Sequence, residues 1–109
     1  MGKETWAYSM PYMKRFSDYE NGVEVSSLMF YSVDLPSRHL GVIEEVQTLE
    51  EYRKQGRATK LIKEAIEHAK SIGCTCVELT VRQDKPHIQD FYKALGFKDR
   101  LNLAYRYEL

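Results

Sequence analysis

The chain has 109 residues, 43% hydrophobic and 29% charged, which are the length and composition of one globular domain. Sixteen acidic residues balance sixteen basic ones, which argues against general affinity for DNA or RNA. No apolar run is long enough for a membrane span, and the N-terminus lacks the apolar segment of a signal peptide. We therefore expect a single domain over residues 1–109, located in the cytoplasm, with no nucleic-acid or membrane partner.

The first half of the sequence predicts three strands joined by short connections. Residues 5–16 and 23–33 are rich in aromatic and β-branched residues, and Asn21-Gly22 between them supplies the positive φ angles of a hairpin. Pro11 implies an edge strand, a bulge or a break in the first segment. Residues 40–49 form the third strand. We expect the three strands to make an antiparallel meander.

The next segments predict a helix and a fourth strand. From Ala58 onward, apolar residues recur at helical spacing, and Gly73 follows as a stop signal. The helix is therefore expected over 58–72. In residues 74–81, apolar and polar residues alternate, which indicates a strand.

The C-terminal part predicts a second helix and a last strand. Asp84 can cap this helix, Pro86 suits its first turn, and Gly96 ends it. Residues 103–109 alternate again and are expected to form the last strand.

This order of elements predicts a mixed α/β sheet of the α+β type. The helix between the third and fourth strands leaves room for a right-handed crossover, so these two strands should run parallel. The cysteines, Cys74 and Cys76, are separated by one residue, a spacing that rarely allows a disulfide. No set of further ligands accompanies them, so we expect free thiols and no metal site.

A cluster of basic residues surrounds the start of the first helix. It comprises Arg53, Lys54, Arg57 and Lys60. A helix start already carries unpaired N–H groups and a partial positive charge, so added cations destabilise it unless an anion binds there. Small residues at Gly56 and Ala58 would let a ligand approach the backbone. On this segment alone, a tight helix entry with a solvated basic rim explains the pattern equally well.

Two motifs point to one family. Arg53-x-x-Gly56-x-Ala58 resembles the Gln/Arg-x-x-Gly-x-Gly/Ala signature of the GNAT N-acetyltransferase superfamily, and Asp90-Phe-Tyr-Lys-Ala-Leu-Gly-Phe97 resembles its later helix. The two occur in the family's order, about a helix and a strand apart, which is more specific than either motif alone. The resemblance covers residues 40–109 well and residues 1–39 only in general strand character.

The resemblance implies that the cofactor is acetyl-coenzyme A. Backbone N–H groups of residues 55–58 would wrap its pyrophosphate, the basic side chains would contact phosphates, and the pantetheine arm would pair with the third strand where it separates from the fourth. Asp84-Lys85 stands where many members carry an Asn that contacts coenzyme A. The candidate cofactor residues are Val46, Gln47, Thr48, Arg53, Lys54, Gln55, Gly56, Arg57, Ala58, Thr59 and Lys85.

The resemblance also assigns an acid. Tyr92 matches the tyrosine that protonates the departing thiolate, although its place on an apolar helix stripe also suits a core aromatic. For the base, Glu44 and Glu45 interrupt an apolar strand, so one of them is expected to face inward, Glu44 slightly ahead of Glu45. The family's best-known glutamate corresponds to Val42, so a water relay is the alternative.

The three histidines are weaker candidates for a catalytic role. His39 is expected in a loop near a possible acceptor site. His68 falls on the polar side of the first helix, and His87 falls in the first turn of the second.

The segment before the third strand is short for this family, at about forty residues. We therefore expect the usual N-terminal helices to be absent. The acceptor cleft would then be open to a protein tail or bulky amine, or a second copy of the chain would complete it. The function expected from the resemblance is direct acetyl transfer to a primary amine in a ternary complex. The alternative is a catalytically weak or inactive module that binds acyl-coenzyme A or a partner.

Overall fold

The structure is a computed structural model, and it describes residues 12–109. The chain divides into two compact units, residues 12–79 and Thr80–Leu109. The first unit contains the strands β1 (Tyr12–Glu20), β2 (Val23–Asp34), β3 (His39–Thr48) and β4 (Cys76–Glu78), a 3-10 turn (Glu50–Tyr52) and the helix α2 (Arg57–Ser71); the second contains the helix α3 (Pro86–Ala94).

The four strands form one sheet in the order β1-β2-β3-β4. The first three are antiparallel, and β3 pairs with β4 in parallel, which confirms the predicted mixed sheet. Asn21 and Gly22, with φ of 51° and 79°, make the predicted hairpin turn. β1 continues to Glu20, beyond the predicted end at residue 16. Residues 5–11 of that predicted strand, with Pro11, lie outside the described residues.

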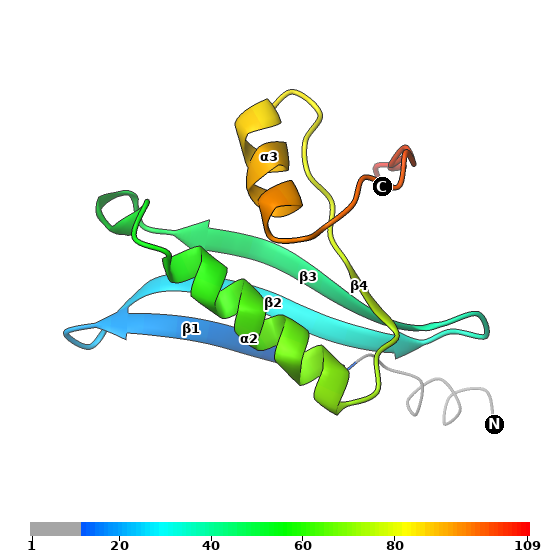
Figure 1. The fold of residues 1–109 in the computed structure, drawn as a ribbon, viewed down its shortest axis with the longest axis horizontal. Coiled ribbons are helices and arrows are strands. Elements are labelled where there is room, and N and C mark those ends of the chain that lie inside the picture. The colour runs from blue at the N-terminus through cyan, green and yellow to red at the C-terminus, as the bar shows by residue number, and fades with distance from the viewer. Residues whose placement is uncertain (1–11) are drawn as a thin grey trace. The chain divides into compact units, whose positions relative to one another are not determined.

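One face of the sheet packs against α2, which Figure 1 shows lying across β1, β2 and β3. The core is aliphatic and aromatic: the helix buries Leu61, Ile62, Ala65 and Ala69, and the sheet buries Phe16, Val25, Leu28, Phe30 and Ile43. Removing one large apolar side chain from water in this way stabilises the fold by about 1.5–3 kcal/mol. The buried face of α2 therefore confirms the predicted apolar stripe, and the helix starts one residue earlier than expected.

Close packing explains a glycine in β3. A Cβ added at Gly41 would lie 2.9 Å from Phe30 Cε1 and 3.4 Å from Cys74 Sγ. Cys74 and Cys76 are both free thiols, as predicted, and burial raises the pKa of Cys74. These contacts hold the end of β3 that pairs with β4 close to the aromatic core.

β3 pairs with β4 over a short length only. Within the described residues, this pairing runs from Leu40↔Cys76 to Val42↔Glu78, while β3 itself continues to Thr48. The predicted fourth strand, 74–81, is therefore reduced to Cys76–Glu78. The second half of β3 has an edge that no described strand covers.

In the second unit, α3 ends in a Schellman motif. Phe97 N–H donates to Tyr92 O and Gly96 N–H donates to Lys93 O, with Gly96 at a φ of 102°. The rings of Tyr92 and Phe97 lie 5.7 Å apart and close the motif with an apolar contact. The Tyr-x-x-x-Gly-Phe spacing thus has a local structural cause.

Two predictions for the C-terminal part are wrong. Lys85, not Asp84, precedes the first turn of α3, and no side chain caps that helix. Asp84 instead accepts two hydrogen bonds from Arg82, at 3.0 and 2.7 Å. Residues 103–109 form no strand, and their side chains are exposed. Alternation supplies one face of a strand but not the partner whose hydrogen bonds a strand needs.

Among the described residues, no helix has the length and apolarity that a membrane crossing requires.

Candidate functional site

The site is built around the turn that leads into α2. Gly56 precedes the helix at a φ of 77°, and Lys54, two residues earlier, has a φ of 62°. Lysine adopts this left-handed conformation at a steric cost that glycine does not carry. The turn therefore changes direction sharply twice, and such turns direct successive N–H groups to one side.

The first N–H groups of α2 are open. No side chain caps this end, and the first backbone hydrogen bond of the helix runs from Lys60 N–H to Gly56 O, 3.0 Å. The N–H groups of Arg57, Ala58 and Thr59 precede that bond and have no helical acceptor. An added Cβ at Gly56, the residue before these groups, would meet nothing within 4 Å, so the space at that position is open. These groups, and the partial positive charge of the helix start, fit an anion such as a pyrophosphate.

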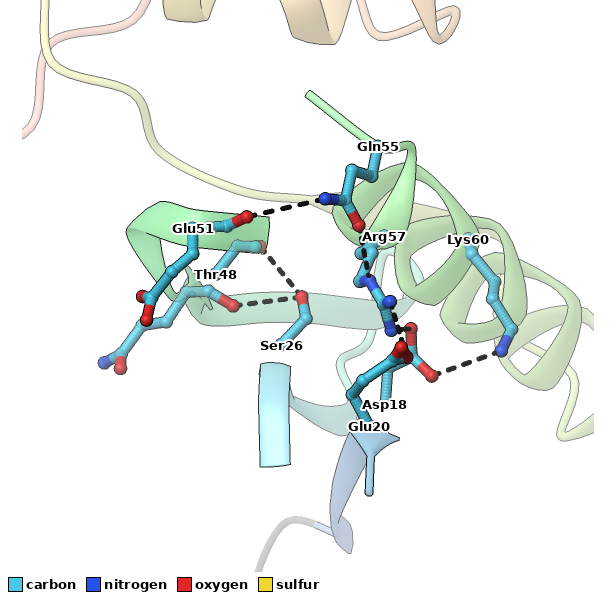
Figure 2. Close-up of polar contacts among 9 residues, drawn as sticks. Asp18, Glu20, Ser26, Thr48, Glu51, Gln55, Arg57 and Lys60 are labelled. Atoms are coloured by element: carbon cyan, nitrogen blue, oxygen red, sulfur yellow. Dashed lines mark hydrogen bonds and ion pairs between the residues drawn. The ribbon is translucent and has the colours of Figure 1, made fainter. Parts of the chain in front are cut away.

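The basic side chains of the turn are largely bound within the protein. Figure 2 shows the Arg57 guanidinium directed at Asp18 and Glu20 of β1, at 3.1 and 2.7 Å. Lys60 Nζ reaches the other oxygen of Asp18, at 3.5 Å. The prediction that an incoming anion must balance these cations is therefore wrong for Arg57 and Lys60, because two carboxylates of the protein already balance them.

The other side chains of the turn differ in their hydrogen bonds within the protein and in their exposure. Arg53 Nε donates to Thr48 O at 3.1 Å, which ties this side chain to the end of β3. Gln55 donates to Glu51 O at 3.4 Å and accepts a hydrogen bond from Arg57 Nε at 3.2 Å. Lys54 is exposed. Lys54 and the far end of Arg53 are thus the basic groups best placed to meet a phosphate.

The ion pairs also set the charge states of their members. The hydrogen bond with Glu20 raises the pKa of Arg57 although burial opposes it. Burial acts to raise the pKa of Asp18, but the charge of Lys60 and the hydrogen bond from Arg57 lower it by more. The Asp18 carboxylate therefore remains charged well into the acid range, and the cluster persists at neutral pH.

The end of β3 carries the candidates for contact with a pantetheine arm. Leu49 N–H donates to Val25 O of β2, so the backbone groups of Thr48 point to the opposite edge, which no described strand covers. Gln47 O accepts a hydrogen bond from Ser26 Oγ at 3.1 Å and so faces β2. The Thr48 carbonyl already accepts the hydrogen bond from Arg53 Nε, so the Thr48 N–H is the candidate for pairing at this edge. Val46 adjoins a bulge.

That bulge overturns the expectation for the two glutamates. Glu45 has a φ of 55°, and the register with β2 shifts between Ser27 and Met29. Because the bulge adds one residue to β3, the alternation of faces changes phase there. Both Glu44 and Glu45 are exposed, so neither is the inward-facing carboxylate predicted from the pattern.

Tyr92 is half-buried in the second unit. Its ring packs edge-on against Phe91 and Phe97, with centroids 5.0 and 5.7 Å away. Burial raises the pKa of Tyr92, so the phenol keeps its proton at neutral pH. A protonated phenol has the charge state that a general acid needs.

None of the three histidines belongs to the turn. The His68 ring packs against Phe16 and Phe30, at centroid distances of 5.8 and 5.4 Å, so the prediction of a solvated side chain was wrong. His39 begins β3 and accepts a hydrogen bond from Thr75 N–H through its backbone carbonyl. His87 is exposed in the first turn of α3, as expected.

Asp18 and Glu20 are the residues of the site that sequence reasoning missed. They fell in the predicted connection after residue 16, whereas β1 extends through both. Two acidic residues spaced by one, as in a strand face, were the available signal. Their partner Arg57 lies 37–39 residues away, beyond any local pattern.

Comparison with known proteins agrees with this geometry. A model of the acetyltransferase (GNAT) family matches residues 3–97. The chain is 39% identical over 57 residues to a thialysine N-epsilon-acetyltransferase of Bos taurus, a match that covers 52% of this chain and 34% of that protein. The chain spans about a third of the length of the curated relatives it matches.

Solved structures share the fold. An acetyltransferase of Trypanosoma brucei superposes with a TM-score of 0.76 at 25% identity, over 98% of this chain and 75% of that one. AAC(6')-Iy, solved in complex with the bisubstrate analog CoA-S-monomethyl-acetylneamine, superposes with a TM-score of 0.78 at 16% identity, over 99% and 77%. The family match extends over most of the sequence, from the strands through α3. The chain belongs to the GNAT family of acetyltransferases.

Proposed function

We propose that this chain transfers an acetyl group from acetyl-coenzyme A to a primary amine, by direct transfer within a ternary complex. The observation that carries the proposal is the uncapped start of α2, where the N–H groups of Arg57, Ala58 and Thr59 have no helical acceptor and follow Gly56, a position with open space around it. A helix start with no side-chain cap suits an anionic ligand as its partner. Acetyl-coenzyme A would supply the pyrophosphate for that position and an acetyl group activated as a thioester.

The remaining cofactor contacts follow from the uncovered edge of β3. Thr48 directs its N–H toward it, beyond the last β3–β4 pair at Val42↔Glu78, while its carbonyl accepts from Arg53 Nε. An amide-containing arm laid there would pair as a strand does, which is how extended ligands add to sheet edges. Lys54 and Arg53 would contact phosphate oxygens from the turn. Lys85, half-buried before α3, is the candidate from the second unit.

Tyr92 is proposed as the acid. Its Oη holds a proton at neutral pH, since burial raises the pKa of the phenol, and it would give that proton to the departing sulfur. For the base, exposed Glu44 and Glu45 would act through water rather than as buried carboxylates. The uncovered β3 edge begins where these glutamates lie, so an amine approaching there would meet them first.

The acceptor is proposed as a primary amine. The similar Bos taurus protein is named for acetylating the ε-amine of thialysine, and AAC(6')-Iy was solved with an analog that joins coenzyme A to an aminoglycoside fragment. Both names describe amine acceptors. Small amines and peptide amines are therefore the compounds to test first.

A second candidate is a module that binds coenzyme A without turnover. The observation in its favour is the exposure of Glu44 and Glu45, which removes the buried base expected from the pattern. Calorimetric titration with coenzyme A, followed by measurement of thiol release from acetyl-coenzyme A over a panel of amines and peptides, separates the two. The enzyme requires binding and amine-dependent thiol release. Binding with no release on any acceptor supports the module, and absence of binding contradicts both.

A further inference from the structure

We propose that Arg57 is a positioning residue that fixes the anion-binding turn onto β1, and that its side chain is not a phosphate ligand. The proposal rests on the proposed function, because it concerns how the same turn is held ready for coenzyme A. It departs from the simplest interpretation of the basic cluster, in which every cation near the turn awaits the phosphates.

The Arg57 guanidinium joins three segments of the chain. Its Nε donates to Gln55 Oε1 at 3.2 Å, its Nη1 to Asp18 Oδ2 at 3.1 Å, and its Nη2 to Glu20 Oε2 at 2.7 Å. Its central carbon lies 5.1 Å from the centroid of the Tyr52 ring. Each guanidinium nitrogen thus has an acceptor within the protein, and the side chain is only 17% exposed.

Because of the position of Arg57 in the chain, these contacts fix the conformation of the turn. Arg57 is the first residue of α2, and its own N–H is one of the open groups. Gln55, which it holds, lies on the other side of Gly56. The side chain therefore spans the left-handed glycine and ties both flanks of the turn to β1, as Figure 2 shows. The guanidinium only donates hydrogen bonds, so it fixes the turn without capping the N–H groups at the helix start.

Geometry favours arginine in this role. A planar guanidinium donates in several fixed directions at once, whereas the ammonium group of lysine is a compact charge on a flexible stem. If Arg57 were instead a phosphate ligand, its guanidinium would first have to break its ion pairs with Asp18 and Glu20. Asp18 is itself 15% exposed and also pairs with Lys60. Releasing Arg57 would leave a partly buried carboxylate without its closest partner.

The two interpretations predict opposite effects when the carboxylates are removed. In Asp18→Asn/Glu20→Gln, Arg57 keeps its charge, and its two anionic partners become neutral amides that hold it less strongly. If Arg57 were a phosphate ligand, freeing it and deleting two negative charges would tighten coenzyme A binding. If Arg57 is a positioning residue, binding weakens although the site has become more positive, by about tenfold for the loss of charge-assisted hydrogen bonds.

The experiment is calorimetric titration of coenzyme A into wild type, the double variant and Glu24→Gln. Glu24 is the matched control, because its carboxylate pairs with Arg15 at 2.6 Å. Arg15 adjoins Phe16 in β1 and so points to the face away from α2. We expect about tenfold weaker binding for the double variant and wild-type affinity for Glu24→Gln. Equal or tighter binding by the double variant overturns the proposal.

A second variant covers a failure of the first to fold, which circular dichroism would detect. Arg57→Lys keeps the charge and cannot hold Gln55 and both carboxylates together. We expect its KM for acetyl-coenzyme A to rise about tenfold with kcat at saturation unchanged, whereas partial unfolding would lower kcat. Wild-type KM in Arg57→Lys overturns the positioning role. Wild type that fails to bind coenzyme A contradicts the proposed function itself, so the two failures are distinguishable.

Discussion

Tyr92 has two roles to distinguish at the residue scale. As the third residue from the end of α3, it accepts the Phe97 N–H through its carbonyl and packs its ring on Phe97, contacts that need the ring and backbone but not the hydroxyl. The hydroxyl is the part that general-acid chemistry requires. A change that removes this one atom therefore separates structure from chemistry.

We predict that Tyr92→Phe lowers kcat by about 10²-fold, the lower end of the range for general acid–base catalysis, with little change in the Kd for coenzyme A. Thiol release and calorimetry measure the two quantities. Tyr105→Phe is the control for loss of a tyrosine hydroxyl, because Tyr105 is 89% exposed outside α3. If Tyr92→Phe turned over acetyl-coenzyme A at the wild-type rate, the tyrosine would be a core residue only.

His68 is a polar residue on the apolar, buried side of α2. Leu61, Ala65 and His68 follow each other at spacings of four and three, so the position belongs to the buried side of α2. The prediction that His68 falls on the polar side of the helix was wrong, because its spacing from Leu61 and Ala65 places it on the buried side. Burial lowers the pKa of His68 below its ordinary value of 6.5, with a smaller contribution from the charge of Lys14.

This shift predicts a pH dependence of stability. Below pH 6.5, the unfolded chain protonates His68 before the folded protein does, so the free energy of unfolding falls as the pH falls through and below that value. His68→Phe keeps an aromatic ring against Phe16 and Phe30 and removes this contribution. We expect the urea midpoint of the variant to change less than that of wild type as the pH is lowered through this range. Exposed His87, changed to Gln, should leave the wild-type dependence in place, and an unchanged slope in His68→Phe would contradict the assignment.

At the scale of elements, the strongly periodic segments were predictable. β2 and α2 lie within one residue of their predicted bounds, because each buries a regular face. The bulge at Glu45 was not predictable, since nothing in its residue type signals a positive φ angle. The prediction of a last strand was wrong for a different reason: residues 103–109 have the alternation of a strand but no pairing partner among the described residues.

The turn at Gly56 gives the sharpest prediction at this scale. Gly56→Asp places a carboxylate beside the open N–H groups of α2, where it competes with a pyrophosphate for the same hydrogen bonds, so coenzyme A binding should be lost. Gly56→Ala is the matched control, because both variants bear the cost of a side chain at a φ of 77°, about 1–2 kcal/mol. We expect Gly56→Ala to melt earlier and still bind coenzyme A. Wild-type affinity in Gly56→Asp would remove the turn from the site.

At the scale of the whole molecule, the sequence led to the family and the mixed sheet, and both are confirmed. It did not lead to the internal balance of charge. Four cations near one helix start suggested a strongly positive anion-binding site, whereas Asp18 and Glu20 of β1 neutralise part of that charge. Long-range pairs of this kind depend on the folded topology: the sequence shows the spacing of Asp18 and Glu20 but not their partner, Arg57. The involvement of a second copy in the acceptor site stays a prediction, which sedimentation with and without acetyl-coenzyme A would address.

The central claim is that main-chain N–H groups at the start of α2 bind the pyrophosphate of coenzyme A. Titration of isotope-labelled wild type with coenzyme A, followed by amide NMR, tests it most directly. The account predicts saturable shifts centred on the amides of Arg57, Ala58 and Thr59, the groups that precede the first helical hydrogen bond. Binding that leaves these three amides unshifted while others respond, or no binding at all, would contradict it.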